Sequence, residues 1–129
     1  MVFLLIEKKE LIEKYLDYFW RNLTEPQALM IIDMDGNILD SKIAECFKNE
    51  YDVMWQKRIA KKISLRFPMA DFYTELGGLE ITVNLFKKYA VINRMINFDK
   101  ILVVITKKIA LNIATSLGII SNSENWPKL

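Results

Sequence analysis

The sequence contains no histidine and only one cysteine, and both shortages narrow the chemistry open to this chain of 129 residues. Without histidine there is no Ser-His or Cys-His nucleophile system, no histidine general base and no basis for most zinc or iron sites. With Cys46 alone, neither an internal disulfide nor a cysteine-based metal site can form. Carboxylates, lysines and hydroxyls are therefore the remaining candidates for catalysis.

Long apolar runs and a strong charge imbalance are also missing. The longest apolar run falls far short of a membrane span, and Met1 to Ile6 lacks the basic leader and the length of a secretion signal. We therefore expect a cytoplasmic protein without direct membrane insertion. The net charge is only +2, and there is no Arg-rich or RNP-like motif, so we expect no nucleic-acid partner.

The chain has enough apolar residues, 52%, to bury the core of one domain. No linker, internal repeat or low-complexity segment divides it. We place a single domain at residues 1–121 and a short polar tail at 122–129. The sequence does not decide whether Trp126 in this tail folds back on the domain or docks elsewhere.

Residues 28–43, ALMIIDMDGNILDSKI, contain the clearest local signal. An apolar run, Ala28 to Ile32, meets a polar turn, which is followed by a shorter apolar stretch. The dipeptide Asp35-Gly36 between two apolar segments predicts a β-hairpin, because glycine accepts the positive φ angle that such a turn requires.

The same turn permits an enzymatic interpretation. Asp33-Met34-Asp35-Gly36 resembles the Asp-x-Asp-Gly signature of haloacid-dehalogenase-like phosphatases, in which the first aspartate is the nucleophile and the second a general acid/base. An EF-hand loop, in contrast, fails on spacing, because its glycine and its final glutamate would be displaced from the positions that calcium coordination requires.

Two amphipathic helices are predicted on either side of this hairpin. Residues 7–23 place apolar side chains on one face and end before Pro26, and residues 44–66 repeat the helical period over a longer stretch. In the longer helix the predicted core-facing residues are Ala44, Phe47, Tyr51, Met54, Trp55, Ile59 and Leu65.

The opposite side of the longer helix predicts an interface between two copies. Cys46, Val53 and Ala60 recur there at a spacing of seven, and small residues on one line let another helix approach closely. The end of the same helix, Lys57 to Arg66, carries five basic residues and no acidic one. The helix dipole favours cations at this end, and docking of an acidic partner is the functional alternative.

From Leu79 onward the apolar period changes to two, which predicts three successive strands at 79–85, 89–96 and 101–106. The first of these strands has one apolar face. The last, ILVVIT, is continuously apolar, as is ALMII in the hairpin, so we expect these two strands to lie side by side in the centre of a sheet covered on both faces. Residues 108–120 predict a closing helix.

The predicted order is helix, two strands, helix, three strands, helix. A dehalogenase-like phosphatase requires a parallel sheet with helical crossovers, and the three successive strands do not supply them. The expected fold is therefore an α/β (α+β) domain with a five-stranded antiparallel sheet flanked by helices, and Asp33 and Asp35 are expected to be turn residues.

This αββαβββα order, with an apolar strand entering a D-x-D-G-type hairpin, resembles the roadblock family of dynein light chains and small-GTPase regulators. ALMIIDMDGNILDS is similar to the family's first hairpin, LEITVNLF and YAVINRMI to its third and fourth strands, and KILVVITKK to its ending. The related longin-like and profilin-like folds share the sheet, but longin domains normally begin with strands, so the helix at 7–23 favours roadblock.

The resemblance implies a dimer in which the middle helices pack antiparallel and the third strands pair. It also implies a small Ras-like GTPase as partner, a second copy or a related roadblock chain as the other subunit, and a non-catalytic scaffold without a cofactor. The predicted interface comprises Cys46, Asn49, Val53, Gln56, Ala60, Glu80, Thr82 and Asn84. The candidates for docking an acidic partner are Lys57, Lys61, Lys62 and Arg66.

Two alternatives stay open at this point. One is a minimal Mg²⁺-dependent phosphatase that uses Asp33 and Asp35. The other is a small sensory domain with an apolar ligand pocket, because several families place helices around a central antiparallel sheet.

Overall fold

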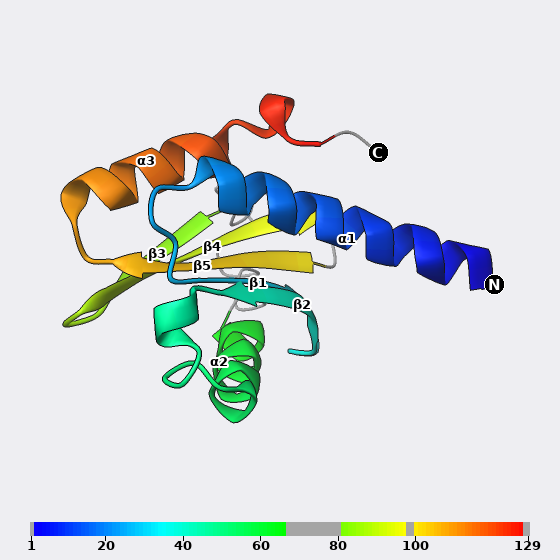
Figure 1. Cartoon of the computed structure of the whole chain (residues 1–129), viewed down its shortest axis with the longest axis horizontal. Coiled ribbons are helices and arrows are strands. Elements are labelled where there is room, and N and C mark those ends of the chain that lie inside the picture. Colours follow the sequence, from blue (N-terminus) through cyan, green and yellow to red (C-terminus); the bar gives the residue numbers. More distant parts are fainter. Residues whose placement is uncertain (1, 67–80, 98–99, 128–129) are drawn as a thin grey trace.

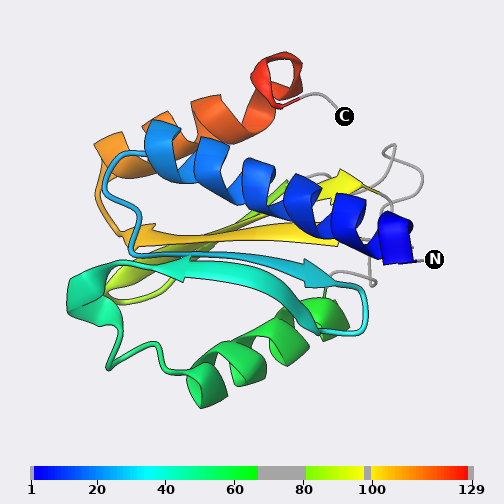
Figure 2. The same ribbon diagram turned by 45° about the vertical axis from the view of Figure 1, so that its right-hand side comes forward.

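The computed structural model describes residues 2–66, 81–97 and 100–127, and these form three layers. A sheet lies in the middle, helices α1 (Val2–Asn22) and α3 (Ala110–Ser121) cover one face, and helix α2 (Val53–Arg66) covers the other (Figures 1 and 2). None of the helices in the described ranges is long and apolar enough to cross a membrane.

The sheet contains five strands within the described residues, all paired antiparallel. They are β1 (Ala28–Asp33), β2 (Ile38–Ile43), β3 (Ile81–Leu85), β4 (Tyr89–Asn97) and β5 (Lys100–Lys107), in the spatial order β2-β1-β5-β4-β3. The predicted helix and strand order and the antiparallel sheet are confirmed. The two continuously apolar strands, β1 and β5, are neighbours at the centre as expected.

The two faces of the sheet carry separate cores. On one face α1 places buried side chains, including Leu16 and Phe19, against alternate residues of β1 and β5 such as Leu29 and Leu102. On the other face α2 and the segment before it cover the remaining alternate residues, including Met30. Both faces of β1 and β5 are therefore apolar, which explains why their sequences do not alternate.

The predicted helix at 44–66 is wrong in its first half. Residues 45–47 form a single 3-10 turn, and α2 begins only at Val53. The carboxylate of Asp52 accepts a hydrogen bond of 2.8 Å from the backbone N–H of Trp55, which satisfies a donor at the start of the helix. This cap resets the helical phase, so positions before and after Asp52 do not share one helical face.

As a consequence, the predicted faces of α2 are partly exchanged. Gln56, Ala60 and Ile63 are buried against the sheet, whereas Met54 and Leu65, both predicted to face the core, are exposed. The apolar period alone does not distinguish the two sides, because both carry apolar residues and the expected arc includes residues outside the helix.

Other boundaries differ less. Helix α1 starts before the predicted residue 7, and its predicted apolar face packs on the sheet. Leu79 and Glu80, at the start of the predicted strand 79–85, lie outside the described residues.

The C-terminal segment folds back on the α1–α3 side. After a 3-10 turn at Ser123–Asn125, the Trp126 side chain is 8% exposed and its ring centroid lies 5.3 Å from that of Phe19. The indole Nε1–H donates a hydrogen bond of 3.2 Å to the backbone carbonyl of Ile119. Of the two possibilities that the sequence left open, the structure therefore has Trp126 folding back.

Candidate functional site

The Asp33–Asn37 turn is held together by the side chain of Asp33. One carboxylate oxygen, Oδ1, accepts hydrogen bonds from the backbone N–H groups of Asp35 and Asn37, both at 2.9 Å, and Oδ2 accepts one from the Asn37 side chain at 3.0 Å. Partial burial opposes ionisation of this carboxyl, but these hydrogen bonds outweigh it and lower the pKa of Asp33 below its ordinary value. Asp33 thus has a structural role in the turn.

The same turn also contacts α2. Gly36 has a φ of +82°, and a Cβ atom at this position would lie 2.7 Å from the Ser64 hydroxyl oxygen and 3.0 Å from the Cα of Lys61. The Lys61 ammonium group donates a hydrogen bond of 2.8 Å to the carbonyl of Asp35. The DMDG motif therefore joins the hairpin to α2.

The phosphatase interpretation required a parallel sheet, and the sheet that the structure shows is antiparallel. Within the described ranges, no three side chains of Cys, Asp or Glu are grouped so that they could hold a metal ion. The prediction that Asp33 and Asp35 are turn residues agrees with the hydrogen bonds of this hairpin.

The outer face of α2 combines apolar side chains with cations. Val53 is 62% exposed, Met54 65% and Leu65 75%. Between and around them lie the exposed cations Lys57, Arg58, Lys61, Lys62 and Arg66. Exposed apolar residues of this size on one helix face are typical of a contact surface, so this face is a candidate interaction site.

The predicted interface residues on this side of the molecule are dispersed. Cys46 and Asn49 are exposed but lie before the helix, and Ala60 is fully buried. Gln56 is also buried, and its amide donates a hydrogen bond of 2.8 Å to the carbonyl of Tyr51. A single helical line through Cys46, Val53 and Ala60 is therefore wrong as geometry, and of its members on α2 only Val53 is available to a partner.

Stacked aromatic rings hold the segment before α2 against the sheet. Tyr51 stacks on Phe47 and Trp55, and its hydroxyl donates a hydrogen bond of 3.0 Å to the buried Gln27 side chain. Burial of this hydroxyl, with the proximity of Tyr89, raises the pKa of Tyr51. The cluster fixes where α2 begins, and hence which side chains α2 presents outward.

Strand β3 forms one edge of the sheet. It pairs with β4 on one side and with no strand on the other within the part of the chain that the structure describes. The side chains of Thr82 and Asn84 point toward α2, while Val83 and Leu85, on the other face, are 38% and 57% exposed. The apolar face that the sequence predicted is thus present but only partly covered.

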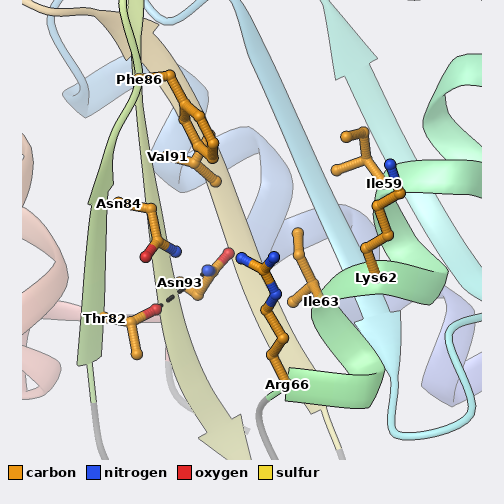
Figure 3. A pocket seen from close by; sticks show the side chains of 9 residues that line it. All are labelled: Ile59, Lys62, Ile63, Arg66, Thr82, Asn84, Phe86, Val91 and Asn93. Atoms are coloured by element: carbon orange, nitrogen blue, oxygen red, sulfur yellow. Dashed lines mark hydrogen bonds between the residues drawn. The ribbon is translucent and has the colours of Figure 1, made fainter.

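Between α2 and β3–β4 lies a cavity that the sequence did not predict (Figure 3). Thr82 and Asn84 line it from β3, and Lys62 and Arg66 line it from α2. Asn93 of β4 lines it as well; the sequence indicated this residue only as part of a strand. The amide of Asn93, which follows the apolar residues Ala90 to Ile92 of β4, was the available signal.

Several solved structures share this arrangement of helices and strands. A structure described as MglB with tetrameric arrangement superposes with a TM-score of 0.69 at 12% identity, covering 89% of this chain and 85% of that one. A roadblock/LC7 domain from Streptomyces avermitilis gives 0.62 at 10% identity, covering 85% and 92%. This chain has the roadblock fold.

A third roadblock-fold structure, the gliding protein MglB from Thermus thermophilus, has a TM-score of 0.66 at 13% identity and covers 89% of this chain and 86% of its own. MglC from Myxococcus xanthus gives 0.59 at 14% identity. No family model matches the sequence, and no curated protein matches it. The likeness to these proteins therefore lies in the fold and not in the sequence.

Proposed function

We propose that this protein is a non-catalytic roadblock-type regulator in a small-GTPase pathway, and that it assembles with a second roadblock chain through α2 and β3. The fold supports the general role, because the sequence resembles a family of small-GTPase regulators and the solved neighbours include MglB and MglC. The second chain is a second copy or a related one.

The proposal rests on two features of the described residues: the outer edge of β3, with which no described strand pairs, and the exposed apolar side chains of α2. The edge of β3 offers backbone groups to another strand, and the outer face of α2 exposes Val53, Met54 and Leu65. A two-fold related copy would cover both elements at once, with its β3 extending the sheet and its α2 covering the exposed side chains.

The charges on α2 restrict how two copies can meet. In a symmetric antiparallel pair of α2 helices centred on their midpoint, Met54 of one copy meets Leu65 of the other, which buries apolar surface. In the same pair Arg58 meets Lys61, and these like charges repel. Self-association therefore balances apolar burial against cation repulsion, and an acidic partner chain would relieve the repulsion.

The basic side chains are also the proposed docking surface for the GTPase or another acidic partner. Lys57, Lys62 and Arg66 are exposed, whereas Lys61 hydrogen-bonds the hairpin turn. Such rim charges mainly accelerate association, and they make it salt-dependent.

Light scattering tests the assembly. The double variant Met54→Gln/Leu65→Gln removes apolar contact without changing charge, and we expect it to shift the wild-type dimer toward monomer by at least about tenfold in the dissociation constant. Leu111→Gln is the matched control, because Leu111 is 70% exposed on α3, on the opposite face of the sheet. A wild-type protein that stays monomeric at micromolar concentration would contradict self-assembly.

The GTPase link is tested by affinity capture from the native organism followed by mass spectrometry. We expect a small Ras-like GTPase among the enriched proteins, and reduced enrichment with Lys57→Glu/Lys62→Glu. Equal recovery by both baits would mean that the basic face is not the docking surface, and capture without any GTPase would count against the pathway.

A further inference from the structure

The cavity between α2 and β3–β4 has the size of a small-ligand site. Its volume is about 280 Å³, just below the range of roughly 300–1,000 Å³ that is usual for drug-sized ligands. A neighbouring cavity of about 390 Å³ shares Ile59, Phe86 and Val91 with it, so the apolar walls continue along the groove toward Trp55 and Tyr89. A compact apolar ligand therefore has room here.

One side of this cavity carries a buried amide whose oxygen is not satisfied. Asn93 is only 3% exposed, and its Nδ2 donates a hydrogen bond of 3.0 Å to the Thr82 hydroxyl (Figure 3). This contact orients the amide, and its Oδ1 accepts no hydrogen bond within the described part of the chain. Buried amide oxygens are nearly always paired, so this atom calls for an N–H or O–H donor from outside.

The α2 side of the cavity carries positive charge. Lys62 and Arg66 line the cavity from successive turns of α2, and no acidic side chain lines it among the described residues. In Figure 3 the Arg66 guanidinium points toward Asn93, whereas the Lys62 side chain runs along the helix to Ile59. Ile59 and Ile63 of α2 and Val91 of β4 supply apolar walls of the cavity. An anionic group that remains near the cations and an apolar body against the wall would both be accommodated.

We propose that this cavity binds a small apolar carboxylic acid that carries an N–H or O–H donor. The donor hydrogen-bonds Oδ1 of Asn93, the apolar body lies against Ile63 and Val91, and the carboxylate pairs with Arg66. The cavity is present in a single chain, so this inference goes beyond the proposed assembly and does not depend on it. It assigns a ligand class to the sensory alternative that the sequence left open.

Calorimetry and ¹H–¹⁵N NMR with three probes test the proposal on the wild-type chain. Indole-3-acetate has the ring, the N–H donor and the carboxylate; 1-methylindole-3-acetate lacks the donor; tryptamine reverses the charge. We expect saturable binding of indole-3-acetate, with a shift of the Asn93 side-chain amide resonance. Loss of the N–H should weaken binding about tenfold or more, because the buried oxygen stays unpaired. Tryptamine should not bind.

Variants then locate the site. Arg66→Gln should weaken indole-3-acetate several-fold, in a salt-dependent manner, because the cation is partly solvated. Lys57→Gln is the matched control, since it makes the same charge change on α2 at a residue outside the cavity, and it should bind like the wild type. Asn93→Leu should abolish the preference for the N–H probe over its methylated analogue.

The outcomes separate cleanly. The proposal is supported if binding is saturable and requires both the N–H and the carboxylate of the probe. Arg66→Gln must also weaken this binding, and Lys57→Gln must leave it unchanged. Absence of binding up to about 5 mM, where even a weak fragment would be detected, overturns it. Equal binding of all three probes also overturns it. So does an equal loss of affinity for indole-3-acetate in Arg66→Gln and in Lys57→Gln. Dimer formation is read separately by light scattering, so failure of one idea does not decide the other.

Discussion

At the scale of single residues, Gly36 is fixed by two independent constraints. Its φ of +82° lies in a region of backbone conformation that residues with a Cβ rarely adopt. The space that a Cβ would need is already occupied by atoms of α2. The backbone Cα of Lys61 is one of those atoms, so the contact cannot be relieved by rotating a side chain. The turn and the helix therefore have to pack as one unit.

We predict that Gly36→Ala lowers the free energy of unfolding by about 1–3 kcal/mol, because backbone strain and the contact with α2 act together. Urea denaturation monitored by circular dichroism measures this. Gly118→Ala is the control, since a Cβ there meets nothing within 4 Å in helix α3. It should be neutral or stabilise by up to about 1 kcal/mol. Equal losses in both variants would contradict the role assigned to Gly36.

Asp33 makes the stability of the fold depend on pH. Its pKa in the folded state is below the ordinary value of 3.8, so its contribution to stability is complete above that value and is lost as the pH falls through the folded pKa. We predict that Asp33→Asn removes part of the acid destabilisation that the wild type shows between about pH 5 and 2. Urea midpoints measured across this range check it. An unchanged pH slope in the variant would mean that other carboxyls account for the loss.

At the scale of elements, α2 shows where sequence reasoning succeeded and where it failed. The strands β1 and β5 could be predicted, because burial on both faces leaves an unbroken apolar run. The start of α2 could not, because the apolar period continues across residues 48–52 and hides the effect of the Asp52 cap. The predicted arc was extended from residues before the helix, so Ala60 and Leu65 were placed on the wrong sides, whereas Trp55 and Ile59 pack on the core as predicted.

The sequence predicted the exposed residues of the candidate sites but not the cavity. Val53 and the basic residues are exposed as expected, since charge and helix position suffice to place them. The cavity depends on the distance between α2 and β3–β4 and on the hydrogen bond that orients Asn93, and both arise only from tertiary packing. No local pattern in the sequence encodes that distance.

The cations of α2 lead to a prediction about self-association. Because like charges face each other in a symmetric α2 pair, raising NaCl from about 50 to about 500 mM should strengthen the dimer by screening. Arg58→Glu should strengthen it by several-fold at low salt, since the carboxylate introduced in each copy would then face Lys61 of the other. Analytical ultracentrifugation measures both.

The control for this change is Lys108→Glu, which alters the net charge equally at an exposed residue just after β5. It should leave the dissociation constant unchanged. A dimer that weakens with salt in the wild type would show instead that opposite charges dominate the contact, and the antiparallel arrangement of α2 would then have to be abandoned.

At the scale of the whole molecule, the two faces of the sheet differ in how they are closed. The α1–α3 face is sealed by a C-terminal residue: Trp126 contacts Tyr15 and Phe19 of α1, and the guanidinium carbon of Arg94 lies 5.3 Å from the Trp126 ring centroid. The α2 face retains a cavity. Among the described residues, one face of the sheet is therefore covered in part by the C-terminal segment, and the other leaves space between α2 and β3–β4.

We predict that Trp126→Ala destabilises the fold by about 2–4 kcal/mol, because it removes a buried aromatic ring and its hydrogen bond to Ile119. Thermal unfolding and urea denaturation test this. Trp20→Ala, at a half-buried position of α1, should cost less. A smaller loss for Trp126→Ala than for Trp20→Ala would mean that the C-terminal segment adds little to the core.

The place of β5 between β1 and β4 also bears on how the chain folds during synthesis. Strand β1 is synthesised before the neighbour that covers its second edge, because residues 100–107 are translated only after β2, α2, β3 and β4. Until then, the β1–β2 hairpin has one edge of its apolar strand β1 unpaired. Such long-range strand pairing slows folding and favours chaperone binding to the nascent chain.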